Sequence, residues 1–186
     1  MSLVIAAISK DNDIIVCGEG RTVDAITDKV YKEDTRKVFK YNESLIVAYV
    51  GDDTKTIPLK VHLLKLCINY YKVWDVESIY KEALKYEKEN HKVENGSIQF
   101  LATGYDDNNN PHLYVISADE NTYIDSDFAP QKTVSIGDME CKLNFDKNND
   151  DIKVIELKIA NTIKERATIN PLINDTITAN EKIFNS

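Results

Sequence analysis

The sequence begins with two short apolar runs in which apolar residues do not alternate with polar ones. Leu3–Ile8 reads LVIAAI and Ile14–Cys17 reads IIVC, and the turn-forming residues Lys10–Asp13 separate them. Apolar runs of this length that are rich in β-branched residues favour β-strands, and the short turn favours antiparallel pairing. A strand that is apolar on both faces must be covered on both faces. The chain is therefore predicted to contain a central sheet layer rather than a sheet with one face in water.

The rest of the chain adds further strands and three helical patterns. Residues 22–34 show no clean periodicity and are expected to form a loop with short extended pieces. Further strands are expected at 35–41, 45–51, 98–103, 113–117, 122–124 and 133–137, with a last hairpin over Leu172–Ala179 and Lys182–Phe184. Helices are expected from Pro58 to about Lys72, from Asp75 to about Asn90, and from Asp150 or Asp151 to about Ala167. In the last helix, Ile152, Ile155, Ile159 and Ile163 share one face. This order suits two antiparallel sheets packed face to face, with helices outside.

Composition sets bounds on size, compartment and partners. With 186 residues, of which 42% are hydrophobic, residues 1–186 are expected to form a single domain. The net charge of -8 argues against nucleic acid as a partner, since binding phosphates needs clustered Lys and Arg. Three scattered cysteines, Cys17, Cys67 and Cys141, suggest neither a disulfide framework nor a zinc site. With no secretory pattern and no run of membrane-spanning length, we expect a cytoplasmic chain with no membrane partner.

One segment resembles the start of a calcium loop. Asp146–Asp150 has the Asp-x-Asn-x-Asp spacing, but Asp151 and Leu157 stand where such a loop needs glycine and glutamate. We therefore expect a solvated turn that caps the following helix, and no metal site.

An ordered series of short elements in the first 52 residues carries a family resemblance. The elements are Val4–Ser9, the turn Lys10–Asp13, the group Cys17-Gly18-Glu19-Gly20-Arg21, the strand start Arg36-Lys37-Val38-Phe39, and the strand end Ala48–Asp52. This series resembles the opening of proteasome β-subunits and of the bacterial protease HslV, which are N-terminal-nucleophile hydrolases. The resemblance implies an α+β fold, the four-layer αββα sandwich, with two antiparallel sheets between helices.

The resemblance also implies a set of site residues. The nucleophile would be the side chain of Ser2, with its own α-amino group, freed by removal of Met1, as the base. Lys37 would lie beside it and Glu19 would pair with Lys37, while Arg21 matches a basic residue often found two positions after that carboxylate. The strand end around Ala48 and Gly51 would supply backbone N–H groups for an oxyanion hole. Asp138 stands where the family has the serine of a Gly-Ser-Gly group, and is a further candidate for the site.

Two functions from different classes follow from the resemblance. The first is a proteasome- or HslV-like subunit that hydrolyses peptide or small amide substrates without a cofactor. The second is a catalytically inactive homologue of the same fold that serves as an assembly or interaction subunit. Because such subunits assemble into rings, a homo-oligomer is expected, and an ATP-dependent unfoldase is a candidate partner if the chain is active.

Overall fold

The computed structural model describes residues 2–24, 27–51, 98–117, 126–127, 132–138 and 141–185. The helices expected over 58–72 and 75–90 and the strand expected over 122–124 lie outside these described residues.

The first sheet is built around the two apolar runs at the start of the chain. Strands β1 (Leu3–Ile8) and β2 (Ile14–Glu19) form an antiparallel hairpin at its centre. Strand β10 (Thr133–Gly137) pairs with β1 and strand β11 (Ile177–Ile183) pairs with β2, so the order is β10-β1-β2-β11. Every residue of β1 and β2 is buried, which confirms the prediction of a layer covered on both faces.

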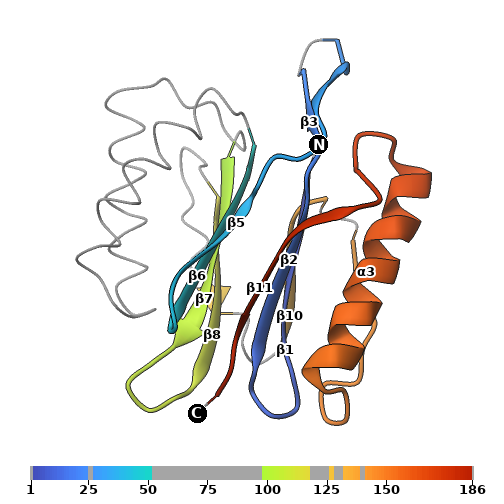
Figure 1. The fold of residues 1–186 in the computed structure, drawn as a ribbon. Helices are drawn as coiled ribbons and strands as arrows, with labels where there is room; N and C mark the ends of the chain where they lie inside the picture. The colour runs from blue at the N-terminus through green and yellow to red at the C-terminus, as the bar shows by residue number, and fades with distance from the viewer. Residues whose placement is uncertain are drawn as a thin grey trace, which may run out of the picture.

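The second sheet is an antiparallel meander in the order β5-β6-β7-β8-β9. Its strands are β5 (Val38–Asn42), β6 (Leu45–Gly51), β7 (Ile98–Tyr105), β8 (Pro111–Ser117) and β9 (Ser126–Asp127). The two short strands β3 (Thr22–Val23) and β4 (Val30–Lys32) form a separate ribbon that projects beyond one end of the sheets (Figure 1). The expected loop with short extended pieces at 22–34 is thus confirmed.

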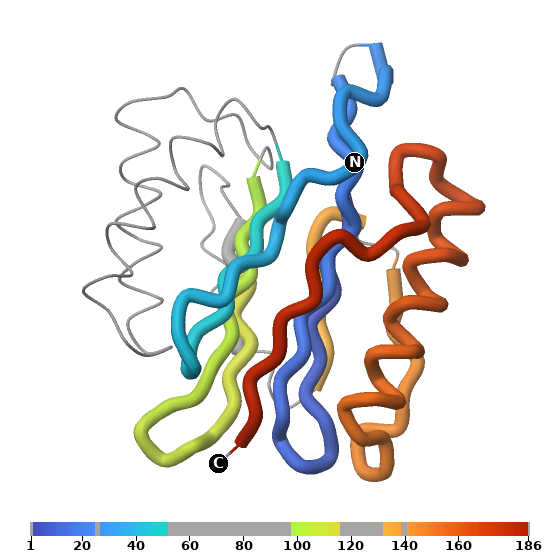
Figure 2. Tube along the Cα trace, in the orientation of Figure 1, coloured from blue at the N-terminus to red at the C-terminus, as the bar shows by residue number. Residues whose placement is uncertain are grey.

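The two sheets pack face to face, and α3 (Ile152–Ile169) covers the outer face of the first sheet (Figures 1 and 2). Between the sheets, side chains such as Val4 and Ala6 of β1 share one buried cluster with Ile46 and Ala48 of β6. Leu3 and Ile5 face the opposite way and pack in a second cluster against the helix. The alternation along β1 therefore sends even-numbered residues between the sheets and odd-numbered residues toward α3.

Helix α3 has the start and the buried face that the sequence predicts. Asp151 is its N-cap, and its carboxylate accepts hydrogen bonds from the backbone N–H groups of Lys153 and Val154. Its buried residues are Ile152, Ile155, Ile159 and Ile163. The structure therefore has a helix layer on the first sheet and two packed sheets. The fourth layer of the expected sandwich would come from the segment 58–90 outside the described residues. Within the ranges given above, no helix is both long and apolar enough to cross a bilayer.

The expected hairpin at the end of the chain is wrong. Residues 177–183 form one strand, and the residues before it form turns. The side chain of Asn170 accepts a hydrogen bond from the backbone N–H of Leu172, and that of Asn174 accepts one from Thr176. Asparagine side chains that bond to the backbone two residues ahead favour turns over strand pairing, which explains the correction.

Candidate functional site

Three side chains from distant parts of the chain meet where β1 begins. Ser2 precedes β1, Glu19 is the last residue of β2, and Lys37 immediately precedes β5 of the other sheet. The Nζ of Lys37 donates hydrogen bonds to Ser2 Oγ at 2.9 Å, to the backbone oxygen of Arg21 at 2.7 Å, and to Glu19 Oε1. Both charged side chains are buried, with exposed fractions of 5% for Lys37 and 0% for Glu19. The sheets therefore enclose an ion pair that touches the hydroxyl of Ser2.

The carboxylate of Glu19 is also held by backbone N–H groups. Its Oε1 accepts a bond from Leu3 at 3.1 Å, and its Oε2 accepts bonds from Arg21 at 2.6 Å and Asn174 at 3.2 Å. A fully buried carboxylate is stable only when its oxygens are paired, and here both oxygens have donors. Since the bond to Leu3 ties Glu19 to the residue after Ser2, the carboxylate also fixes the start of β1.

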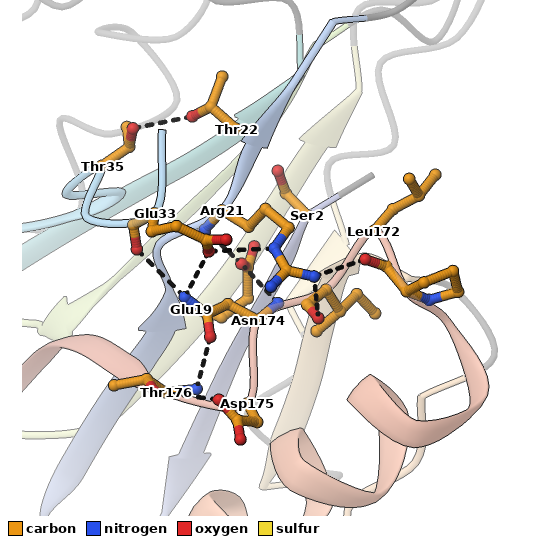
Figure 3. Close-up of polar contacts among 12 residues, drawn as sticks. Ser2, Glu19, Arg21, Thr22, Glu33, Thr35, Leu172, Asn174, Asp175 and Thr176 are labelled. Atoms are coloured by element: carbon orange, nitrogen blue, oxygen red, sulfur yellow. Dashed lines mark hydrogen bonds and ion pairs between the residues drawn. The ribbon is translucent and has the colours of Figure 1, made fainter. Parts of the chain in front are cut away.

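Beyond these backbone groups, further polar side chains lie near Glu19 (Figure 3). The guanidinium of Arg21 contacts Glu33 at 3.0 Å and donates to the backbone oxygens of Pro171 at 2.5 Å and Ile173 at 3.3 Å. The side-chain amide of Asn174 donates to Glu33 Oε2 at 2.8 Å. These contacts connect the segment after β2 with the segments after β4 and after α3.

Ser2 lies directly against the backbone of Gly137 at the end of β10. A Cβ built on Gly137 would lie 1.9 Å from the backbone oxygen of Ser2, and the glycine has a φ of +90°. Any other residue would clash with Ser2 and would also adopt a strained backbone conformation. The N–H of Gly137 donates to the side chain of Gln99 on β7 at 2.8 Å, which links this strand end to the second sheet.

Asp138 is buried, with an exposed fraction of 3%, but its partner lies on α3. Arg166 makes a two-bond contact with it, Nε to Oδ2 at 2.7 Å and Nη2 to Oδ1 at 3.0 Å. Two parallel charge-assisted bonds of this kind fix both direction and distance. Asp138 therefore directly follows the glycine that packs against Ser2, and its carboxylate is bound to α3.

The strand end proposed for the oxyanion hole lies next to Lys37 in the second sheet. Ala48 is buried in β6 and pairs with Val38, the residue after Lys37, and the N–H of Tyr49 donates to the backbone oxygen of Lys37 at 3.1 Å. Gly51 ends β6 with a φ of 134°, in the region that favours glycine. These contacts place the β6 strand beside Lys37, while the role of Ala48 and Gly51 as donors stays a prediction.

The charges at Lys37 and Glu19 decide which group could take a proton from Ser2. An opposite charge in direct contact favours the ammonium form of a lysine, and an ammonium can donate a hydrogen bond but cannot accept a proton. Lys37 can therefore orient the hydroxyl and stabilise negative charge on Oγ. A reaction that uses Ser2 needs a different base.

The cysteines of the described chain do not supply that base. Burial raises the pKa of the Cys17 thiol to about 12, with smaller opposing effects of Glu156 and Lys182. Burial is also the main reason that the pKa of Cys141 is raised to about 11. Both groups are thus thiols at neutral pH. Among the residues with described positions, no group of His, Cys, Asp and Glu has the arrangement of a metal site. The Asp146–Asp150 segment forms a turn in which the Asp146 carboxylate accepts the N–H of Asn148.

Sequence reasoning missed Glu33, Asn174 and Arg166 as members of the site. Each reaches it through a contact with a residue 12 to 155 positions away in the chain. Glu33 and Asn174 carry no local pattern that sets them apart from other polar loop residues. Arg166 lies in the last turn of a predicted helix, where a basic residue is common for its own reasons.

The chain has the fold of two groups of solved structures. It is similar to the eukaryotic HslV from Trypanosoma brucei, with a TM-score of 0.69 at 13% sequence identity over 98% of this chain and 99% of that one. It is also similar to the Anbu (Gly-1) mutant from Hyphomicrobium sp. strain MC1, with a TM-score of 0.74 at 10% identity over 99% of this chain and 87% of that one. Anbu, an ancestral beta-subunit, from Yersinia bercovieri gives a TM-score of 0.72 at 12% identity over 98% and 87% of the two chains.

No protein-family model matches the sequence, and no curated protein matches it significantly. At these identities the structural similarity shows the fold alone.

Proposed function

We propose that this chain, which has the fold of HslV and Anbu, is a proteasome-type subunit that hydrolyses amide bonds with Ser2 as an N-terminal nucleophile. The observation that carries the proposal is the contact of the Ser2 hydroxyl with the buried Lys37–Glu19 pair. A buried ion pair that contacts a serine hydroxyl just before β1 is costly as a purely structural device, because both charges lose their hydration.

The proposed reaction begins when removal of Met1 frees the α-amine of Ser2. Ser2 Oγ attacks the carbonyl carbon of a peptide or small amide, and the α-amine takes the hydroxyl proton, directly or through a water molecule. The ammonium of Lys37 stabilises the negative charge that forms on Oγ, and backbone N–H groups near Ala48 and Gly51 stabilise the oxyanion. The proton then passes to the leaving nitrogen as the C–N bond breaks. Water hydrolyses the resulting ester and regenerates the serine.

Covalent labelling with a β-lactone tests this proposal. The protein is made with Ser2 as its first residue, and intact mass and peptide mapping locate the acyl group. We expect one acyl group on Ser2, no labelling of Ser2→Ala or Lys37→Ala, and normal labelling of the control Ser44→Ala in the β5–β6 turn. A second form with an uncleavable residue before Ser2 lacks the free serine amine and should not react. Equal labelling of both forms would exclude the α-amine as the base.

Subunit contacts are the second part of the proposal. The β3–β4 ribbon carries two exposed apolar side chains, Val30 at 48% and Tyr31 at 82%. In the proposed assembly these two side chains would be covered by neighbouring subunits. A homo-oligomer in the cytoplasm, with an ATP-dependent unfoldase as a further partner, would use such contacts. An inactive subunit of the same fold would keep them without turnover. Light scattering after size exclusion tests the assembly, and a monomer at micromolar concentration would exclude the homo-oligomer.

A further inference from the structure

Asp138 follows the last residue of β10, and Ser2 precedes the first residue of β1. Strands β1 and β10 are antiparallel, and Leu3 pairs with Gly137. One step further, the residue before Leu3 comes opposite the residue after Gly137. Side chains at opposite positions of an antiparallel pair lie on the same face of the sheet. In a regular strand the carboxylate of Asp138 would therefore lie beside the hydroxyl of Ser2, between the two sheets.

The backbone conformation of Gly137 changes the direction of the Asp138 side chain. Ile136 lies in the core between the sheets, so a regular alternation would return to this core at Asp138. Instead, the φ of +90° at Gly137 ends the alternation, and Asp138 bonds to Arg166 of α3 on the opposite side of the sheet. The glycine permits the turn, and the arginine supplies the partner that holds the carboxylate there.

The position of Arg166 lets its guanidinium bind the Asp138 carboxylate firmly. It lies in the last turn of α3, three residues after Ile163, which is fully buried against the first sheet. Its two bonds to Asp138 are 2.7 and 3.0 Å long, and the exposed side-chain fractions are 16% for Arg166 and 4% for Asp138. A two-bond contact with little access to water neutralises the carboxylate and fixes it to α3.

We propose that Arg166 is a positioning residue that keeps the carboxylate of Asp138 on the α3 side of the sheet and away from the terminal amine of Ser2. The inference rests on the proposed function, in which that amine is the base. A carboxylate released from Arg166 would lie next to the amine and favour its ammonium form, which cannot take the serine proton. Among the described residues, Lys37 bonds the Ser2 hydroxyl and pairs with Glu19. The other charged groups on the elements packed here are Arg21 and Glu33, which pair with each other after β2 and β4, and the pair of Asp138 after β10 with Arg166 on α3.

The test is a titration of the serine amine that needs no turnover. Protein with Ser2 as its first residue is acetylated briefly with acetic anhydride across a pH series, and the N-terminal peptide is quantified by mass spectrometry. We expect Arg166→Gln to raise the midpoint by about one pH unit, which leaves roughly tenfold less free amine at a fixed pH below the midpoint. Arg166→Gln combined with Asp138→Asn should return the midpoint to the wild-type value, because the carboxylate is gone.

Three outcomes would overturn the inference: an unchanged midpoint in a folded Arg166→Gln, a double variant that stays shifted like the single one, or a raised midpoint in Asp138→Asn alone. If Arg166→Gln fails to fold, Arg166→Lys provides the comparison. Lysine keeps the positive charge but cannot make two parallel bonds to the carboxylate. We therefore expect a rise in the midpoint of less than one pH unit. An unchanged midpoint in Arg166→Lys would count against the two-bond geometry.

The titration also separates this inference from the proposed function. If the wild-type protein acylates at Ser2 but the midpoints do not differ, the positioning role of Arg166 fails and the hydrolase proposal stands. If no variant reacts with the β-lactone but the midpoints shift as expected, the hydrolase proposal fails and the electrostatic role of Arg166 stands.

Discussion

Replacing Lys37 with methionine removes the ammonium from a fully enclosed carboxylate. Glu19 is 0% exposed and its Oε1 faces Lys37. Leaving one member of a buried ion pair without its partner costs about 3–5 kcal/mol of folding free energy. For a chain of this length, this corresponds to a fall in melting temperature of roughly 6–20 °C. Methionine has nearly the same volume as lysine, so the cost reflects the lost charge rather than a cavity.

Chemical denaturation of a matched set of variants measures this cost. The control is Lys40→Met, because Lys40 pairs with Glu43, whose side chain is 89% exposed, and such pairs contribute less than about 1 kcal/mol. The double variant Glu19→Gln with Lys37→Met should be more stable than Lys37→Met by about 1 kcal/mol or more. The oxygen of the neutral glutamine can still accept the backbone bonds of Arg21 and Asn174, although the Leu3 bond is lost, and no buried charge is left unpaired.

Two results would refute this reasoning. A loss in Lys37→Met no larger than that in Lys40→Met would mean that the Glu19 carboxylate does not depend on the ammonium. A double variant less stable than Lys37→Met would mean that the charge on Glu19 is favourable even without its partner. Either result would remove the physical basis for the proposed site.

Further predictions concern the backbone, pH and thiol reactivity. Gly137→Ala should lower the free energy of unfolding by more than about 2 kcal/mol and abolish labelling at Ser2, since it adds left-handed strain and a clash with the Ser2 backbone; wild-type labelling would contradict the close packing. Asp106, in the β7–β8 turn, accepts bonds from Asn110, which hold the pKa of its carboxyl well below the ordinary 3.8. The ionised carboxyl therefore stabilises the fold above pH 3.8, and this effect is lost as the pH falls through the pKa of the folded state. Urea unfolding should show Asp106→Asn less stable than wild type at pH 7, with a difference that shrinks in acid. A difference independent of pH would exclude the ionised carboxyl as its cause. Iodoacetamide at neutral pH should leave Cys17 and Cys141 unmodified in the folded protein and modify both in urea, as peptide mass spectrometry can establish; fast labelling of the folded protein would contradict their burial.

The parts of the fold that sequence predicts well are those with a strong local pattern. The β1–β2 hairpin follows from two apolar runs and a polar turn, and α3 follows from isoleucines at helical spacing after a capping aspartate. The end of the chain was predicted wrongly. Apolar residues such as Leu172 and Ile173 have strand propensity, but the neighbouring Asn170 and Asn174 side chains bond to the backbone and form turns.

The site is less predictable because it is assembled across the fold. Only the family resemblance suggested that Lys37 and Glu19 would meet at Ser2, since no periodicity relates positions 2, 19 and 37. The contact of Asp138 with Arg166 depends on the backbone turn at Gly137 and on the rotation of α3, neither of which has a signature in composition or spacing. Side-chain contacts between distant segments need the tertiary structure.

The pairing of β11 with β2 determines how early in synthesis the surroundings of Ser2 and Glu19 can form. Ile177 pairs with Glu19, and the turn just before that strand supplies the Asn174 N–H that binds the same carboxylate. A nascent chain on the ribosome therefore lacks part of the wall around Glu19 until Asn174, 155 residues further along, has been synthesised. A serine that could cut amide bonds would therefore gain its full surroundings only after these 155 residues have been made.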